Sequence, residues 1–253
     1  MKEIRYFFVP DAGEMTELPA DEAAHCVRVL RMQEGDEICL TDGFGAFYRA
    51  EITAVTNKKC CYRILEKSLM EKTWRGHLHI AMAPTKNNDR TEWFAEKAEE
   101  IGFDELTFLN CKFSERRVIK NDRIEKILVS AMKQSHKAVK PILNDMTDFG
   151  HFVCQNFPGQ KFIAHCYDEC DIVSEDKSAD DKTIDGGKEF LLDVLDADQD
   201  ALVLVGPEGD FSVEEVRLAL SHGFRSVSLG KSRLRTETAA LVAVHLMNLK
   251  HTI

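Results

Sequence analysis

From residue 79 onward, short apolar runs alternate with longer helical segments, and this alternation restricts the fold more than any other feature. A run of four or five apolar residues is typical of a buried strand, whereas apolar residues that recur every three or four positions indicate an amphipathic helix. Alternating strands and helices predict an α/β fold, in which helices cover both faces of a mostly parallel sheet. The expected strands are His79–Ala83, Leu106–Leu109, Phe162–Cys166, Ala201–Val205 and Ser226–Leu229. The expected helices are Asp89–Ile101, a segment that begins near Asn121 or Asp122, Ser212–Ser221 and Thr236–Leu249.

The first seventy residues follow a different pattern, in which strands are separated by turn residues such as Asp42-Gly43 and Asn57-Lys58. We expect a small barrel-like β module over 1–70, suited to binding, followed by a catalytic domain over 71–253. Residues 171–187, rich in Asp, Ser, Lys and Gly, are expected to form a mobile loop. The expected strands of the module are Ile4–Val9, Glu37–Thr41, Phe47–Val55 and Cys60–Leu65, with one helix over Asp21–Arg31.

Composition limits the class of protein. Apolar residues make up 44% of the 253 positions, but no signal peptide and no run of eighteen apolar residues is present, so we expect a soluble, cytoplasmic protein. The eight cysteines form no CxxC pair, which argues against a disulfide framework. Cys166 and Cys170, beside His165, lack a second pair, so we interpret them as buried free thiols and expect no metal.

The net charge of −10 is unusual for a protein that binds nucleic acid, but the charge is unevenly distributed. Residues 168–200 alone hold 13 acidic and 3 basic residues. Residues 112–140 hold nine basic residues and three acidic ones, which predicts a basic surface. A solvated helix face is the alternative interpretation of that segment.

The apolar run Ala201–Val205 leads directly into Gly206-Pro207-Glu208-Gly209. Ligands of open α/β sheets bind at the carboxyl ends of strands, and glycine allows a ligand to approach the backbone closely. Ser212 and Glu215 have the spacing of a capping box, so the next helix should begin just after this turn. An ordinary strand-to-helix turn is the alternative explanation.

A second strand end has the sequence LGKSRLRTETA, residues 229–239. Two glycine-containing strand ends close together in the sequence could build one pocket. Neither contains G-x-G-x-x-G or the phosphate-binding loop G-x-x-x-x-G-K-[ST], which removes the usual support for a dinucleotide or nucleoside triphosphate site.

Together, GPEGDFS at 206–212 and LGKSRLRTETA at 229–239 resemble the RsmE family of the SPOUT superfamily, whose members methylate N3 of a uridine in 16S ribosomal RNA. The resemblance extends over nearly the whole chain. Arg5-Tyr6-Phe7-Phe8, Lys97 with Glu100-Ile101-Gly102, and Gln134-Ser135-His136-Lys137 are similar to family signatures. Asp210 stands where a second glycine is usual, and it adds a carboxylate beside the pocket, although Asp adopts left-handed dihedrals better than most residues.

The resemblance implies a SPOUT-type sheet with a C-terminal trefoil knot, preceded by a PUA-like RNA-binding module. It also implies a homodimer that uses S-adenosylmethionine as cofactor. The implied substrate is 16S ribosomal RNA, either free or in the small ribosomal subunit. From the chemistry of methyl transfer, we hypothesise catalytic roles for two residues. Arg235 would stabilise negative charge on the uracil oxygens, and Glu237 would orient Arg235 or assist proton removal. A carboxylate favoured by the helix dipole is the alternative for Glu237. The implied cofactor-binding residues are Leu204, Gly206, Pro207, Glu208, Gly209, Leu229, Gly230, Leu234, Thr238 and Ala239.

Basic residues of the module and of the 112–140 segment are expected to contact RNA phosphates. These residues are Arg5, His25, Arg28, Arg31, Lys112, Arg116, Arg117, Lys133, Gln134 and Lys137. Two other functions remain open: a non-catalytic RNA-binding assembly factor for ribosomes, and a SPOUT methyltransferase that acts on another RNA, such as transfer RNA.

Overall fold

The computed structural model describes residues 4–168, 172 and 188–253, and it confirms the expected α/β class. The chain divides into two compact units, Met1–Thr73 with Leu128–Lys140, and Trp74–Ile127 with Pro141–Ile253. The segment Leu128–Lys140 therefore belongs to the N-terminal unit, which proximity in sequence did not suggest. The expected boundary near residue 70 stays a prediction. Within the described residues, no helix is both long enough and apolar enough to span a bilayer.

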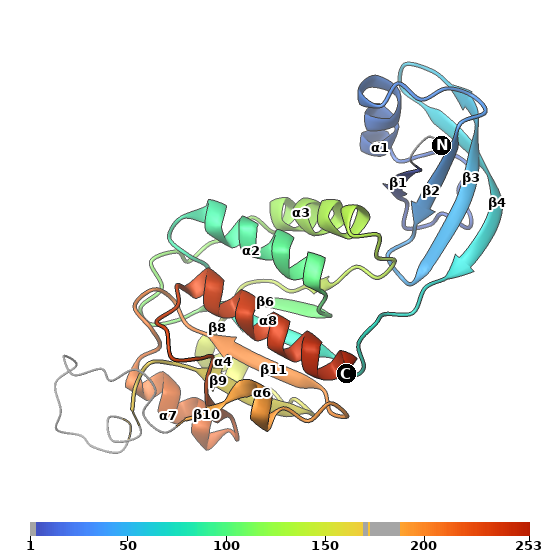
Figure 1. The fold of residues 1–253 in the computed structure, drawn as a ribbon. Coiled ribbons are helices and arrows are strands. Elements are labelled where there is room, and N and C mark those ends of the chain that lie inside the picture. The colour runs from blue at the N-terminus through green and yellow to red at the C-terminus, as the bar shows by residue number, and fades with distance from the viewer. Residues whose placement is uncertain (1–3, 169–171, 173–187) are drawn as a thin grey trace. The chain divides into compact units, whose positions relative to one another are not determined.

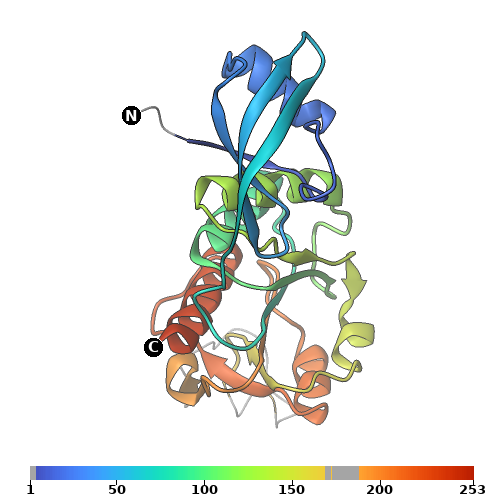
Figure 2. The same ribbon diagram turned by 90° about the vertical axis from the view of Figure 1, so that its right-hand side faces the viewer.

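The N-terminal unit is built on a four-stranded sheet of order β1-β2-β3-β4. β1 pairs with β2 in parallel, and the other neighbours are antiparallel (Figure 2). Alternate residues of these strands, such as Ile38, Leu40 and Ile52, are fully buried in one core. The strands are β1 (Arg5–Phe8), β2 (Glu37–Thr41), β3 (Ala46–Val55) and β4 (Cys60–Leu69), and α1 (Ala20–Ala24) continues into a π-helical turn, His25–Val29.

The larger unit has a parallel sheet of order β10-β12-β9-β11-β5-β6-β7, and β8 pairs with β6 beside this path. The strands are β5 (Leu78–Met82), β6 (Glu105–Asn110), β7 (Ile142–Leu143), β8 (Thr147–Asp148), β9 (Gln160–Ala164), β10 (Glu189–Phe190), β11 (Ala201–Val205) and β12 (Arg225–Ser228). The helices that lie wholly in this unit are α2 (Asn88–Ile101), α4 (Phe149–Val153), α6 (Leu191–Val194), α7 (Val213–Ser221) and α8 (Thr236–Thr252). The helix α3 (Asn121–Gln134) begins in this unit and ends in the N-terminal unit.

Helices cover both faces of this sheet, as the sequence predicted (Figure 1). Successive residues of a strand point to opposite faces. Leu202 and Leu204 of β11 pack in the same core as residues of α4 and α7. On the opposite face, α8 packs on β5 and β11 and against α2. Burial on both faces explains why every residue of β11 is apolar and buried.

Most expected elements are present, with small shifts at their ends. The helix expected over Asp21–Arg31 ends earlier, and Arg31 adopts a left-handed φ of 53°. β7, β8 and β10 have two residues each, which is too short for a periodic pattern to reveal. Apart from Ile172, the loop expected over 171–187 lies outside the described residues.

Cys166 is exposed, so its interpretation as a buried thiol is wrong. The strand expected to include it ends at Ala164, and residue 166 therefore lies beyond the sheet edge, where neighbouring strands do not cover it. Cys170 lies outside the described residues.

A partly buried polar network joins β5 and β6 at the edge opposite the carboxyl ends of the strands. The His79 ring nitrogen Nε2 lies 2.8 Å from Thr107 Oγ1, and His77 Nε2 lies 2.6 Å from Glu105 Oε2. Burial lowers the pKa of His79 from 6.5 to about 4. Burial raises the pKa of Glu105, but hydrogen bonds from His77 and Asn144 and the charge of His79 outweigh it and lower the pKa to about 2.

We expect the free energy of unfolding to fall as the pH drops from about 6.5 to 4, by about 3 kcal/mol through His79. The pKa of His79 is lower in the folded protein, so the unfolded chain binds the proton first on acidification. Glu105 adds a further loss only as the pH falls below its ordinary value of 4.5. Urea unfolding measured between pH 7 and 4 tests this, and His79→Gln should flatten the curve. Parallel curves for wild type and variant would contradict the assignment.

Candidate active site

The strand order brings three carboxyl ends together at one edge of the sheet. β9 lies between β12 and β11, and all three strands run in parallel. The residues that follow them, His165 after β9, Gly206 after β11 and Leu229 after β12, therefore leave the sheet side by side. This is the edge at which open α/β sheets bind ligands.

A cavity of about 580 Å³ opens at this edge. Its walls come from the ends of β9, β11 and β12, from Lys188, from Arg90 of α2 and from the first residues of α8. Its volume lies in the range of small-molecule sites, which is about 300–1,000 Å³. The two glycine-containing turns that the sequence singled out thus share one cavity.

Gly206 is required by the tightness of the turn after β11. A Cβ atom at this position would lie 3.0 Å from the backbone nitrogen of Phe211 and 3.1 Å from its ring. Both are closer than ordinary van der Waals contact, and a backbone atom cannot move away cheaply. The sequence Gly-Pro-Glu-Gly therefore serves to fold the chain back on itself at the cavity wall.

Asp210 connects this turn to the end of β9. Its φ is 68°, in the left-handed region, as its side chain allows. One carboxylate oxygen accepts a hydrogen bond from the Cys166 backbone N–H at 2.9 Å, and the other accepts from Phe211 N–H at 2.8 Å. The Tyr167 hydroxyl donates to the Phe211 carbonyl at 2.8 Å. The carboxylate, which stands where the family usually has glycine, thus holds two of the three cavity walls together.

The helix after the turn begins as the sequence predicted. The Ser212 hydroxyl accepts from Glu215 N–H at 3.2 Å, and the Glu215 carboxylate accepts from Ser212 N–H at 2.7 Å. The other Glu215 oxygen accepts from Lys112 N–H at 2.7 Å. The capping box is therefore confirmed, and it also ties α7 to the segment after β6.

His165 contributes a neutral imidazole to the cavity wall. The Tyr167 backbone N–H donates to Nδ1 at 3.2 Å, so the ring proton lies on Nε2, which donates to Ser226 Oγ at 2.8 Å. Burial, with a smaller contribution from the charge of Lys188, lowers the pKa of His165 to about 3. At neutral pH this ring adds no positive charge to the wall.

The predicted cofactor-binding residues fall into two groups. Those that line the cavity are Gly206, Pro207, Glu208, Leu229, Gly230, Leu234 and Ala239. Leu204 lies instead in the core beneath α4 and α7, Gly209 faces Phe113, and Thr238 lines a neighbouring cavity. Cofactor binding stays a prediction for all ten positions, and the cavity places only the first seven together.

Sequence reasoning missed the wall formed by the end of β9, namely Ala164, His165 and Cys166. The signal was available, because Phe162–Cys166 was an expected strand whose carboxyl end had to lie at the same edge of a parallel sheet. Arg90 and Lys188 were missed for a different reason. They reach the cavity from segments that carry no motif.

A second cavity, also of about 580 Å³, lies between the start of α2 and the start of α8. It shares Arg90, Arg233, Leu234 and Arg235 with the first cavity. Its remaining residues are Asp89, Trp93, Glu237 and Thr238.

Both residues with expected catalytic roles lie here. Arg235 is exposed at the start of α8, and within the described part of the chain its guanidinium has no hydrogen-bond or ion-pair partner. Glu237 is 6% exposed, and its Oε1 lies 3.8 Å from Nε of Arg90. The residue that the structure pairs with Glu237 is therefore Arg90 rather than Arg235.

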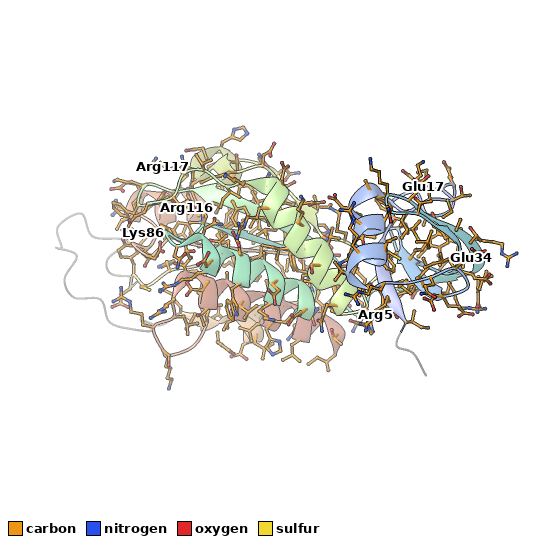
Figure 3. The ribbon with its side chains drawn as sticks, turned by 90° about the horizontal axis from the view of Figure 1, so that it is seen from above. Arg5, Glu17, Glu34, Lys86, Arg116 and Arg117 are labelled. Atoms are coloured by element: carbon orange, nitrogen blue, oxygen red, sulfur yellow. The ribbon has the colours of Figure 1, made fainter. Side chains whose placement is uncertain are left out.

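Arg116, one of the expected RNA-binding residues of the larger unit, contacts the segment before α2. Arg116 donates to the carbonyl oxygens of Thr85 and Lys86, at 3.1 and 2.7 Å, and Glu208 accepts from Lys86 N–H at 2.8 Å. Lys86, Arg116 and Arg117 gather at one end of this unit (Figure 3). Arg116 thus also has a structural role, because it holds the segment that leads into α2 and the cavity.

Among the other expected RNA-binding residues, several are already engaged. Lys112 pairs with Glu214 at 3.1 Å, and Lys133 pairs with Glu22 at 2.5 Å, both measured from Nζ. Of the expected RNA-binding residues in the N-terminal unit, those that are exposed are Arg5, His25, Arg28, Arg31 and Gln134. Lys137 is partly buried and donates a hydrogen bond to Ser135.

Comparisons with known proteins agree with this arrangement. The family described as an RNA methyltransferase domain matches residues 72–248, and an RNA methyltransferase PUA domain matches 18–65. Ribosomal RNA small subunit methyltransferase E of Bacillus subtilis is 26% identical over 253 residues, covering 95% of this chain and 94% of its own. The crystal structure of a probable rRNA-methyltransferase from Porphyromonas gingivalis is 41% identical, with a TM-score of 0.86 and 98% of each chain covered. A Legionella pneumophila protein assigned as a methyltransferase, solved with the bound cofactor SAM, is 26% identical, with a TM-score of 0.82 over 98% of each chain.

Replacing Asp210 tests whether its carboxylate holds the cavity walls together. Asp210→Gly keeps the left-handed φ but loses both hydrogen bonds, so the free energy of unfolding should fall by about 2 kcal/mol. Asp210→Asn retains one acceptor and should lose about half as much. Urea unfolding measures both, and Asp193→Ala, which removes an exposed carboxylate of α6, is the control. A glycine variant as stable as wild type would show that the carboxylate is dispensable.

Proposed function

The chain belongs to the RNA methyltransferase family, and we propose that it methylates N3 of one uridine in 16S ribosomal RNA of the small subunit. It is an RNA methyltransferase that uses S-adenosylmethionine, and RNA is its partner. The observation that carries the proposal is the cavity shared by the turns after β11 and β12, beside the exposed Arg235 at the start of α8.

The first cavity fits the methyl donor. We assign the adenosine of the donor to the backbone of Gly206, Pro207, Leu229, Gly230 and Leu234, which line this cavity. Gly206 lets a ligand approach this backbone because it carries no side chain. Neutral His165 also suits the site, since a protonated imidazole would repel a positively charged sulfonium.

Bound S-adenosylmethionine supplies a methyl group that is already strongly electrophilic. The protein therefore has to hold the uracil nitrogen in line with the methyl group, stabilise charge and accept a proton. We assign charge stabilisation to Arg235, which lines both cavities. We assign proton acceptance to Glu237, with Arg90 holding its carboxylate.

Assembly and location are also proposals. The resemblance to the RsmE family supports a homodimer, a trefoil knot at the C-terminal end and action on ribosomal RNA in the cytoplasm. A non-catalytic assembly factor would have no need of a donor cavity. Calorimetry with S-adenosylmethionine separates the two functions, because only the enzyme should bind the donor. Mass spectrometry of ribosomal RNA from cells with and without the gene then reports whether 3-methyluridine is formed.

Arg235→Ala should lower kcat by about 100-fold or more, because one donor to developing charge is removed. The donor Kd, measured by calorimetry, should change little if Arg235 acts mainly on the uracil. Lys231→Ala is the matched control, since Lys231 lies exposed in the same loop but lines neither cavity. Full methylation by the Arg235 variant at saturating donor and RNA would remove Arg235 from the mechanism.

Arg28 and Arg31 test the RNA-binding role of the N-terminal unit. If both meet phosphates, the double alanine variant should reduce the slope of log K against log salt by about 1.4 to 1.8. Arg63→Ala is the control, because Arg63 pairs with Glu51 on the sheet. Filter binding to 16S ribosomal RNA at several salt concentrations gives the slopes. An unchanged slope in the double variant would exclude these two contacts.

A further inference from the structure

The second cavity holds a buried carboxylate oxygen with no partner. Glu237 is 6% exposed, and its Oε2 has no hydrogen-bond partner among the described residues, whereas Oε1 faces Arg90. An unsatisfied buried carboxylate oxygen costs free energy unless something donates a hydrogen bond to it. The cavity is therefore suited to a ligand that presents an N–H or O–H group.

The same cavity contains an exposed tryptophan. Trp93 of α2 is 43% exposed, whereas the second tryptophan, Trp74, is 5% exposed and donates to Asp104. A large apolar ring left open to solvent at a cavity wall is a surface on which a planar group can stack. Bases of single-stranded nucleic acid stack on such rings, each worth about 1–3 kcal/mol.

The two cavities are continuous through shared residues. Arg90, Arg233 and Arg235 line both of them. Glu237 lines the second cavity beside these arginines, and its Oε1 lies 3.8 Å from Nε of Arg90. The side chains around this cavity therefore include guanidinium donors and one carboxylate that can accept a hydrogen bond.

Uracil has the complementary edge, since its N3–H donor lies between two carbonyl acceptors. Building on the proposed function, we propose that the second cavity receives the target uridine after it leaves the RNA stack. The base stacks on Trp93, Glu237 Oε2 accepts the hydrogen bond from N3–H, and Arg90 and Arg235 donate to the carbonyl oxygens. Cytosine would instead present an acceptor at N3 to the Glu237 carboxylate, so this cavity selects uracil.

In the proposed reaction, one proton leaves N3 and one methyl group is added to it. The N3 proton passes to Glu237, and the N3 electron pair forms the new bond to the methyl carbon. The bond between that carbon and the donor sulfur breaks, and its electrons remain on sulfur. Arg90 is a positioning residue in this scheme, because it acts on the base and on the carboxylate of Glu237.

Trp93 separates base binding from donor binding, because it lines only the second cavity. Trp93→Ala should raise KM for 16S ribosomal RNA or lower kcat, with kcat/KM reduced about tenfold or more. The Kd for S-adenosylmethionine should not change. Trp93→Phe should restore most of the activity, because a smaller aromatic ring still stacks. Ile142→Ala, which truncates an exposed apolar residue on edge strand β7, should behave as wild type.

Glu237 is tested by base selectivity rather than by rate. With S-adenosylhomocysteine bound, the wild-type protein should bind transcribed 16S RNA about tenfold more tightly when the methylated position carries uridine than when it carries cytidine. Glu237→Gln should reduce that ratio to about one, because an amide both donates and accepts. Thermal unfolding checks that the variant is folded.

The outcomes distinguish the two proposals. If the wild-type protein methylates no uridine, the proposed function fails. If it methylates uridine normally while Trp93→Ala matches Ile142→Ala, or while Glu237→Gln keeps the preference for uridine, the second cavity is not the base site. A weaker donor Kd in Trp93→Ala would also overturn the assignment.

Discussion

The hydrogen bonding of β9 between β11 and β12 is the constraint on which the rest of the structure depends. Register pairs Val205 with Ala164, and Ala164 with Val227, so the three strands end at nearly the same level. Strands that end together deliver their following turns to one edge, and the cavity forms between those turns. A shift of register by one residue would turn every side chain of the shifted strand to the opposite face.

Polar contacts then hold the turns in place, together with the buried ring of Phe211. The Asp210 carboxylate accepts a hydrogen bond from the backbone beyond β9. Glu208 accepts one from the segment before α2, and Glu215 accepts one from the segment after β6. Each carboxylate accepts from a backbone N–H that would otherwise lack a partner at a strand or helix end. Two acidic side chains of the turn and one from the first turn of α7 thus attach this region to three neighbouring segments.

The start of α8 divides the site into two parts. Arg235 lines both cavities, and Glu237, two residues later, turns into the second. Residues at the first turn of a helix diverge by about 100° per residue, so neighbours in sequence can serve different ligands. Donor and acceptor can therefore be held by a single short segment, which suits a reaction that needs the two reactants in line.

The sequence by itself determined the parallel sheet, the identity of its main strands and the two glycine-containing turns, because apolar runs and glycines act locally. It also determined the capping box at Ser212, for which spacing alone suffices. Only the tertiary structure decided that β9 separates β11 from β12, which brought His165 and Cys166 to the cavity. Likewise, only the packing of α2 against α8 placed Arg90 at Glu237 and opened the second cavity. Strand order and helix packing depend on contacts between distant segments, which no local pattern encodes.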